Sequence, residues 1–357
     1  ARPLGNVIDL GLVLAPASDL LRLLAVPVFG WAAWRDVKIR RVPNATWLPL
    51  LALAVLALAL QALDLSATGG YVWRRFLSQV AISIGLVVPL AYVFWRIGGF
   101  GGADAKALMA LAVLFPTYPT YSAPPLLVDL GVPADLPFQT TAIGVFSLTV
   151  LTDTVLVGLA YPLALAVRNT VAGRVGTAMF LGRVVPVPEL TVLHGRLFET
   201  REGFTRSGLD LDALRMYLRW RGCTLAELRA DAERLRRPES VDKTHHPTDG
   251  AVEAGAEGSL GGLTLADGGA VVSQTDAEPQ ASVDDPWAAQ QFLDDIDHTA
   301  YGTDADTLRE GLETVAAREQ VWISPGLPFI VPMFFGLVVA LTYGDVLYGL
   351  LLAAGLV

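Results

Sequence analysis

The chain has 357 residues, of which 53% are hydrophobic and 17% are charged, and its formal net charge is −9. A charged fraction well below the roughly 25% of soluble domains indicates a membrane protein. The acidic balance argues against a nucleic-acid-binding protein, whose surface would be basic. The single cysteine, Cys223, excludes an internal disulfide framework and a thiolate metal cluster, and we expect it to be structural.

Six apolar segments can cross a bilayer, whose roughly 30 Å core needs about 20 helical residues. They are residues 17–34, 47–65, 76–95, 103–118, 141–167 and 327–351. Asp19 and Arg22 lie near the start of the first segment, Asp153 lies inside the fifth, and the fourth is short. We therefore expect an all-α polytopic membrane protein with six transmembrane helices, five within residues 1–167 and the last within 325–357.

The connection between the fourth and fifth segments, residues 119–139, contains five prolines. It predicts a structured loop that has no room for another span.

A polar region separates the fifth segment from the sixth. Residues 168–237 and 289–324 predict a small mixed α/β domain: residues 179–198 alternate in polarity like short strands, and two amphipathic helices follow at 209–219 and 225–237. Thr224 and Glu227 have the spacing of a capping box at the start of the second helix. A further helix is expected within 306–321, leading to the last span.

Residues 238–288 are rich in Gly, Ala, Ser and acid, and we expect an acidic disordered linker there. From Thr244 to Leu308 there are thirteen Asp or Glu residues and no Lys or Arg. Such an acidic excess keeps proteins soluble at high salt and indicates a halophilic source.

The basic residues favour one orientation in the membrane. Arg35, Lys38, Arg40, Arg41, Arg96, Lys106, Arg168 and Arg174 all fall on the same side of the predicted spans. The opposite loops hold Arg74 and Arg75 but also three acids. Since cytoplasmic loops are enriched in Lys and Arg, we expect both termini outside and the mixed α/β insertion in the cytoplasm.

Two acids then fall at the same, cytoplasmic face. Asp36 closes the first span and Asp104 opens the fourth, and the chain crosses the bilayer twice between them. A pair of neighbouring carboxylates shares a proton, because two like charges a few Å apart do not both ionise easily. The ionised member can activate water while the protonated member polarises a scissile carbonyl. The pattern therefore predicts aspartic-type peptide hydrolysis.

Both acids lie in distinctive surroundings. Asp104 follows four glycines, Gly98, Gly99, Gly101 and Gly102, which suit a tight turn or close approach by a substrate strand. Asp36 precedes a basic stretch that ends in a Pro43-Asn44 turn. We expect Lys106 to reach lipid headgroups rather than to act on the protonation of Asp104.

These stretches resemble the archaeal prepilin and preflagellin peptidases, membrane aspartic proteases with a Gly-x-Gly-Asp signature. The resemblance matches Asp36 to the first catalytic acid, Val42-Pro43-Asn44 to the turn that follows it, and Asp104 to the acid of the glycine motif. The final segment, from Pro325, also looks like that family's last span. One departure is Ala103, which stands where the signature has glycine.

The resemblance implies a peptidase that removes a short basic leader from type IV pilin-like or archaellin-like precursors at the cytoplasmic membrane face. It implies precursor proteins and the lipid bilayer as partners, with no cofactor. Bacterial relatives add N-methylation, often alongside a four-cysteine domain, so with one cysteine we expect no methyltransferase activity. His245 and His246 have no third ligand at helical spacing, so no metal is expected.

Two other functions stay open. A presenilin-like or signal-peptide-peptidase-like protease would use the same pair of acids inside the bilayer, but both acids lie at its boundary and the last span has no Pro-Ala-Leu motif. A proton- or ion-coupled transporter would use Asp153, because ionisable groups within spans are functional candidates. A transporter would also be expected to show internal repeats, and the sequence has none that we can recognise.

Overall fold

The computed structural model describes residues 7–9, 14–39, 42–123, 125–131, 133–200, 203–205, 207–252, 285–296, 300–326 and 328–357. The chain divides into two compact units, Ala1–Tyr161 with Pro328–Val357, and Pro162–Leu327. We call the first the apolar unit and the second, which interrupts it in sequence, the inserted unit.

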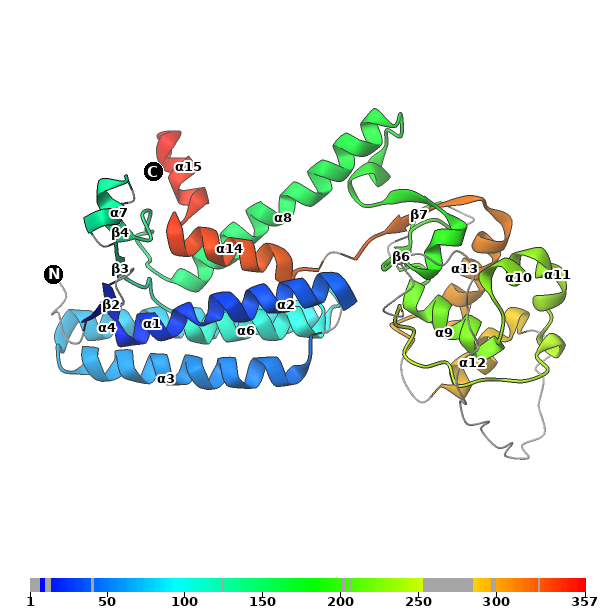
Figure 1. The fold of residues 1–357 in the computed structure, drawn as a ribbon, viewed down its shortest axis with the longest axis horizontal. Coiled ribbons are helices and arrows are strands. Elements are labelled where there is room, and N and C mark those ends of the chain that lie inside the picture. The colour runs from blue at the N-terminus through cyan, green and yellow to red at the C-terminus, as the bar shows by residue number, and fades with distance from the viewer. Residues whose placement is uncertain are drawn as a thin grey trace. The chain divides into compact units, whose positions relative to one another are not determined.

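Helices dominate the apolar unit (Figure 1). They are α1 (Ala17–Leu23), α2 (Ala25–Ile39), α3 (Trp47–Ser66), α4 (Gly70–Ile82), α5 (Val88–Arg96), α6 (Gly102–Leu114), α7 (Pro125–Asp129), α8 (Phe146–Val171), α14 (Ile330–Thr342) and α15 (Val346–Ala353). A π-helical turn, Ser83–Val87, joins α4 to α5. Helix α8 continues past Tyr161 into the inserted unit.

Three helical segments are long and apolar enough to cross a membrane: Asn44–Ser66, Gly70–Arg96 and Phe146–Val171. Helices α6 and α14 have 13 residues each, about 20 Å at 1.5 Å per residue, which is less than the roughly 30 Å of a bilayer core. The predicted last segment is interrupted between Thr342 and Val346. The number of six spans therefore stays a prediction.

The first predicted segment forms two helices that meet at Leu24. Pro27 contributes to the interruption, because it lacks the amide that would bond to the carbonyl one turn earlier. Asp19 and Arg22 are buried as an ion pair of 2.6 Å, and Arg22 also donates to Gln61 of α3 over 2.8 Å. This pairing explains how an apolar segment holds two charges.

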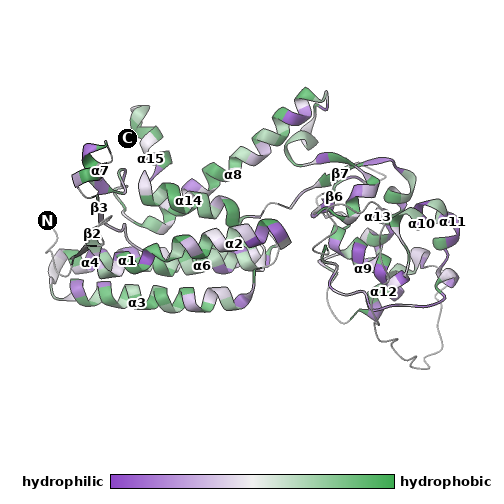
Figure 2. Ribbon diagram, in the orientation of Figure 1, coloured by the Kyte–Doolittle hydropathy of each residue, from purple (hydrophilic) through white to green (hydrophobic). Residues whose placement is uncertain are grey.

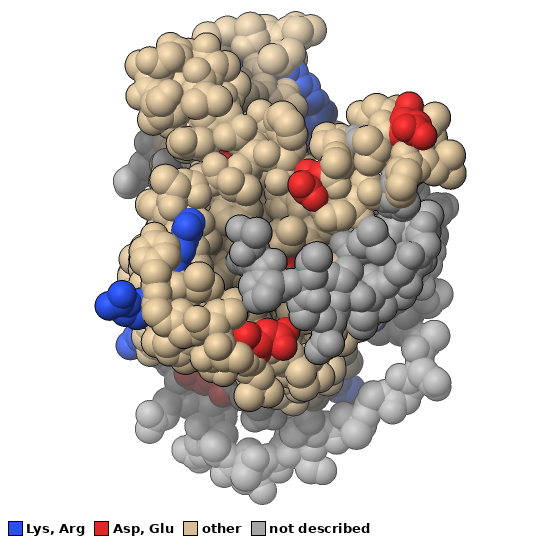
Figure 3. Space-filling view, turned by 90° about the vertical axis from the view of Figure 1, so that its left-hand side faces the viewer, with Lys and Arg blue, Asp and Glu red and all other residues tan. Residues whose placement is uncertain are grey.

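Short strands cover one end of the apolar unit. Strands β1 (Val7–Asp9), β2 (Leu14–Pro16), β3 (Tyr121–Ser122) and β4 (Asp135–Leu136) form an antiparallel sheet in that order. The predicted loop at 119–139 supplies β3, α7 and β4. Figure 3 views this end, where separate acidic and basic side chains lie among uncharged ones.

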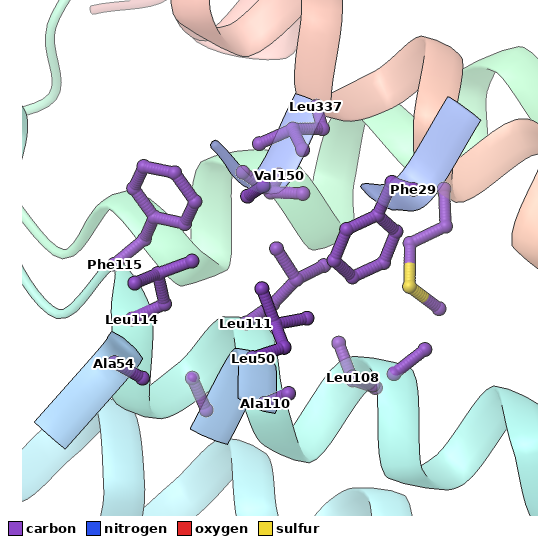
Figure 4. Packing of buried hydrophobic residues seen from close by; sticks show 14 of the residues in the cluster. Phe29, Leu50, Ala54, Leu108, Ala110, Leu111, Leu114, Phe115, Val150 and Leu337 are labelled. Atoms are coloured by element: carbon purple, nitrogen blue, oxygen red, sulfur yellow. The ribbon is translucent and has the colours of Figure 1, made fainter. Parts of the chain in front are cut away.

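A shared core joins the helices of the apolar unit. Side chains from five helices converge in it (Figure 4): Phe29 of α2, Leu50 and Ala54 of α3, Leu108 and Leu111 of α6, Val150 of α8, and Leu337 of α14. The outward faces of the long helices are also apolar (Figure 2), as Leu48, Val55 and Leu63 show with at least half of their surface exposed. An apolar exterior around an apolar core is what a lipid environment favours.

Helices α8 and α14 approach each other closely. A Cβ atom on Gly336 would lie 2.6 Å from the amide nitrogen of Thr154, and one on Gly158 would touch Pro332 at 3.8 Å. Small residues at such contacts let helix backbones pack closely in membranes.

The inserted unit combines a small sheet with short helices. Strands β5 (Arg183–Pro186), β7 (Gln320–Ser324) and β6 (Arg196–Leu197) pair antiparallel in that order. Strands β5 and β6 lie within residues 179–198, where strands were expected, whereas β7 follows the expected helix and was not predicted. Helices α9 (Leu211–Arg221), α10 (Leu225–Ala230), α11 (Ala232–Leu235), α12 (Ala289–Asp295) and α13 (Ala305–Ala317) surround a core that contains Trp220, Trp287 and Phe292. The capping box of Thr224 and Glu227 is present, whereas the second predicted helix breaks at Asp231.

Both ends of the range expected as a linker, 238–288, contact the rest of the inserted unit. The carbonyl of Gly250 accepts a bond from the buried Arg215, and Trp287, which is 1% exposed, belongs to the core. Sequence composition missed these contacts because one tryptophan and one carbonyl barely change a local average. Residues 253–284 lie outside the described part of the chain.

Replacing Gly336 by alanine should destabilise the apolar unit by about 1–3 kcal/mol, because the added methyl group overpacks the contact with α8. Thermal unfolding of the detergent-solubilised protein measures the effect. Gly85→Ala is the matched control, since a Cβ atom there meets nothing within 4 Å. Equal stability of the two variants would contradict the close α8–α14 contact.

Candidate active site

Asp36 lies in the last turn of α2, on the side of the helix that faces the core. It follows Phe29, Ala32 and Ala33, all buried in the apolar unit, at helical spacing. Asp36 itself is only 7% exposed. The helix therefore carries its carboxylate inward at the end of a buried face.

Asp104 is the third residue of α6 and is partly buried. Its Oδ2 atom accepts a hydrogen bond of 3.0 Å from the backbone amide of Gly101, which caps the helix. A Cβ atom on Gly101 would lie 2.9 Å from that oxygen. Glycine at this position lets the backbone approach the carboxylate closely.

Ala103 stands inside α6, one residue before Asp104. A helical backbone suits any L-residue, so alanine fits where the resembled signature has glycine. The departure noted in the sequence therefore carries no conformational penalty here.

The two helix ends that carry these acids lie at the same end of the apolar unit (Figure 1). Lys106, in the first turns of α6, donates a 2.6 Å hydrogen bond from Nζ to Oδ1 of Asn44. Asn44 opens the short 3₁₀ turn that follows the α2 loop, directly after Pro43. Lys106 thus joins the loop after Asp36 to the helix of Asp104, a contact that our expectation of a headgroup-facing lysine missed. Arg40 and Arg41 lie outside the described residues.

The glycine loop before Asp104 is fixed by aromatic contacts. Gly98 adopts a positive φ of 76°, and the amide of Gly99 donates to the carbonyl of Phe94 over 2.7 Å. Phe100 packs against Phe94 and Phe329, with ring centroids 5.0 and 4.7 Å apart. Phe329 directly precedes α14. These rings carry no distinctive sequence signal, because apolar residues beside spans are common.

An apolar groove of about 550 Å³ borders the same region. Its walls come from α2, from the loop and 3₁₀ turn that follow it, and from the start of α3: Pro27, Val28, Trp31, Pro43, Ala45, Thr46 and Pro49. The guanidinium carbon of Arg35 lies 5.5 Å from the centre of the Trp31 ring. This groove was also missed, because it forms only when the loop after α2 folds back on the helix.

The remaining chemical candidates lie elsewhere. Asp153 accepts a bond from the amide of Val346, at the start of α15. Burial raises the pKa of Cys223 to about 11, which leaves almost no thiolate at neutral pH and argues against a nucleophile. The described residues include no group of three His, Cys, Asp or Glu side chains that could hold a metal ion.

Two protein-family models match the chain. The type IV leader peptidase family model matches residues 23–166, which contain Asp36, Asp104 and the glycine loop. The archaeal peptidase A24 C-terminus type II model matches residues 279–346, which contain α14. The chain belongs to the type IV leader peptidase family. No curated protein matches the sequence. Membership of this peptidase family and the three long apolar helices support a membrane-bound protease.

In this leader peptidase, Gly101→Ala should reduce precursor cleavage by about 10-fold or more, because small displacements of a reacting group are costly. The new methyl group would push the Asp104 carboxylate out of place. Gly85→Ala, outside the glycine loop, is the control, since its Cβ atom meets nothing within 4 Å. Initial rates on a purified precursor distinguish the two, and equal rates would show that the Gly101 contact has no role.

A double-mutant cycle tests the bond between Asn44 and Lys106. Asn44→Ala and Lys106→Ala should each slow cleavage several-fold, and the double variant should be little slower than either, because the pair acts as one contact. Lys38→Ala, an exposed lysine at the end of α2, should combine additively with Asn44→Ala. Additive losses for Asn44 and Lys106 would mean that their hydrogen bond does not hold the two segments together.

Proposed function

We propose that this leader peptidase is a membrane aspartic endopeptidase that uses Asp36 and Asp104 to remove the short basic leader of type IV pilin-like or archaellin-like precursors. The observation that carries the proposal is the meeting of the two acid-bearing helix ends, which the bond between Lys106 and Asn44 connects. Helix α2 runs towards this end and α6 runs away from it, so the last turn of α2 and the first turn of α6 each carry one carboxylate there.

The chemistry follows from a pair of carboxylates that holds one proton. The ionised carboxylate removes a proton from water as the water oxygen attacks the scissile carbonyl carbon. The protonated carboxylate donates its proton to the carbonyl oxygen, which gives a neutral tetrahedral intermediate. Collapse of this intermediate breaks the C–N bond: the carboxylate that gave up its proton takes one from a hydroxyl group of the intermediate, and the other carboxyl group protonates the leaving nitrogen. The pair is then back in its starting state. The two acids titrate as a unit, so neither is assigned the starting proton.

The surroundings suit a precursor that is cut just before an apolar helix. The groove beside Trp31 offers an apolar surface next to the end of α2, and the glycine loop leaves its backbone accessible to an extended segment. We propose that the precursor helix lies along the apolar surface while its leader crosses the glycine loop.

The basic side chains at this end favour a cytoplasmic location. Arg35, Lys38 and Lys106 all lie near the two acid-bearing helix ends, as expected of the cytoplasmic boundary of a membrane protein. We propose six membrane crossings, with both termini outside and residues 168–324 in the cytoplasm. With one cysteine in the chain, we propose peptidase activity without methyl transfer.

Asp36→Asn and Asp104→Asn should each abolish leader removal, a loss of about 1,000-fold or more, because asparagine keeps the size but cannot exchange a proton. The assay follows cleavage of a purified precursor that carries a lysine-rich leader before an apolar helix. Asp64→Asn serves as control, since Asp64 is exposed near the end of α3. Wild-type cleavage by either site variant, when correctly folded, would disprove the aspartic mechanism.

A further inference from the structure

Two more acids are buried in the apolar unit, away from the candidate active site. Asp153 of α8 is 1% exposed and Asp345, between α14 and α15, is 6% exposed. Asp153 lies seven residues into α8, about 10 Å along the helix at 1.5 Å per residue. The proposed mechanism of leader removal uses neither residue.

Only one of the two carboxylate oxygens of Asp153 accepts a hydrogen bond from the described residues. Its Oδ1 atom accepts a 3.1 Å hydrogen bond from the amide of Val346, the first residue of α15. Its Oδ2 atom is buried and has no hydrogen-bond partner among the described residues. A buried carboxylate oxygen that has lost water and gained no donor is costly, particularly in an apolar unit.

Asp345 lies beside Asp153, and both of its carboxylate oxygens accept hydrogen bonds. It caps α15, with Oδ1 accepting from the amide of Tyr348 over 2.8 Å and Oδ2 accepting from the Thr149 hydroxyl over 2.9 Å. Thr149 in turn lies 2.5 Å from the Tyr118 hydroxyl. The positive end of the α15 dipole also offsets part of the charge on Asp345.

The turn that presents these groups depends on glycine. Gly344 has a φ of 99°, and a Cβ atom there would lie 1.8 Å from the carbonyl oxygen of Gln139. The amide of Asp345 donates to that same carbonyl over 3.0 Å. The break between α14 and α15 is therefore held in place, and it brings a second carboxylate to the first.

No basic side chain in the described part of the chain offsets the two buried carboxyl groups of Asp153 and Asp345. Among the described residues, no Lys, Arg or His forms an ion pair with Asp153 or Asp345. Two hydrogen bonds and a helix terminus compensate Asp345, whereas one amide compensates Asp153. Asp153 is thus the less compensated of the two acids, and buried charges in proteins are usually paired or coordinate a metal ion.

We propose that Asp153, Asp345 and Thr149 form a binding site for one hard monovalent cation, for which sodium is the probe. Carboxylate and hydroxyl oxygens are the ligands that such cations prefer. The free Oδ2 atom of Asp153 is the principal ligand, and Asp345 and Thr149 offer further lone pairs. The cation ties α8 to the start of α15.

Equilibrium binding of radioactive sodium to the purified full-length protein tests the site, with choline chloride holding the ionic strength constant. Wild type should bind one sodium ion per chain in a saturable manner. Asp153→Asn and Asp345→Asn should each weaken that binding by about 10-fold or more, since each removes a charged ligand. Asp64→Asn, on the exposed end of α3, should bind like wild type.

A second readout keeps the test independent of folding defects. Sodium should raise the thermal unfolding temperature of wild type, because a ligand that binds the folded state stabilises it, and Asp153→Asn should lose this dependence while remaining folded in choline. Saturable binding that is equal in wild type and Asp153→Asn would overturn the proposal. So would stabilisation by acid alone with no response to sodium, which would mean that a proton occupies the site. Neither outcome bears on leader removal, which uses other acids.

Discussion

The hydrogen bond between Lys106 and Asn44 reflects the constraint on which the site depends. Helix α2 must end where α6 begins, although α3, α4 and α5 lie between them in the sequence. Helix α3 leads away from this end of the apolar unit and α4–α5 returns to it, so the helix ends that carry Asp36 and Asp104 lie together although the chain between them runs the length of the unit. Peptide hydrolysis by two carboxylates requires such a meeting, because neither acid alone both activates water and protonates the carbonyl.

Core packing behind the site holds the end of α2 and the start of α6 in place. Phe29 on α2 and Leu108 on α6 enter one core, together with side chains of α3, α8 and α14 (Figure 4). Phe100 extends this support to the glycine loop by packing on Phe329. The proposed pair of acids at the edge of a bundle would need such support, since supporting residues keep reacting groups in place.

Sequence alone predicted the features that depend on composition and local pattern. The long apolar runs became α3, α4–α5 and α8, and the capping box of Thr224 and Glu227 formed as expected. The resemblance carried by Asp36, the Pro43-Asn44 turn and Asp104 led to the correct family. The features that sequence missed depend on contacts between distant segments: the four-stranded sheet at one end, the packing of Trp287 after the linker, and the Asp153–Val346 bond. Such contacts leave no periodic signal along the chain.

Cross-linking tests the meeting of the two acids most directly. Asp36→Cys and Asp104→Cys are combined in a Cys223→Ser background, so that the introduced thiols are the only ones in the chain. Mild oxidation or a short thiol cross-linker in native membranes should join them rapidly, whereas Asp36→Cys combined with Asp64→Cys, at opposite ends of α2 and α3, should remain unlinked. Failure of the first pair to link, in a protein that folds normally, would contradict a catalytic pair formed by Asp36 and Asp104.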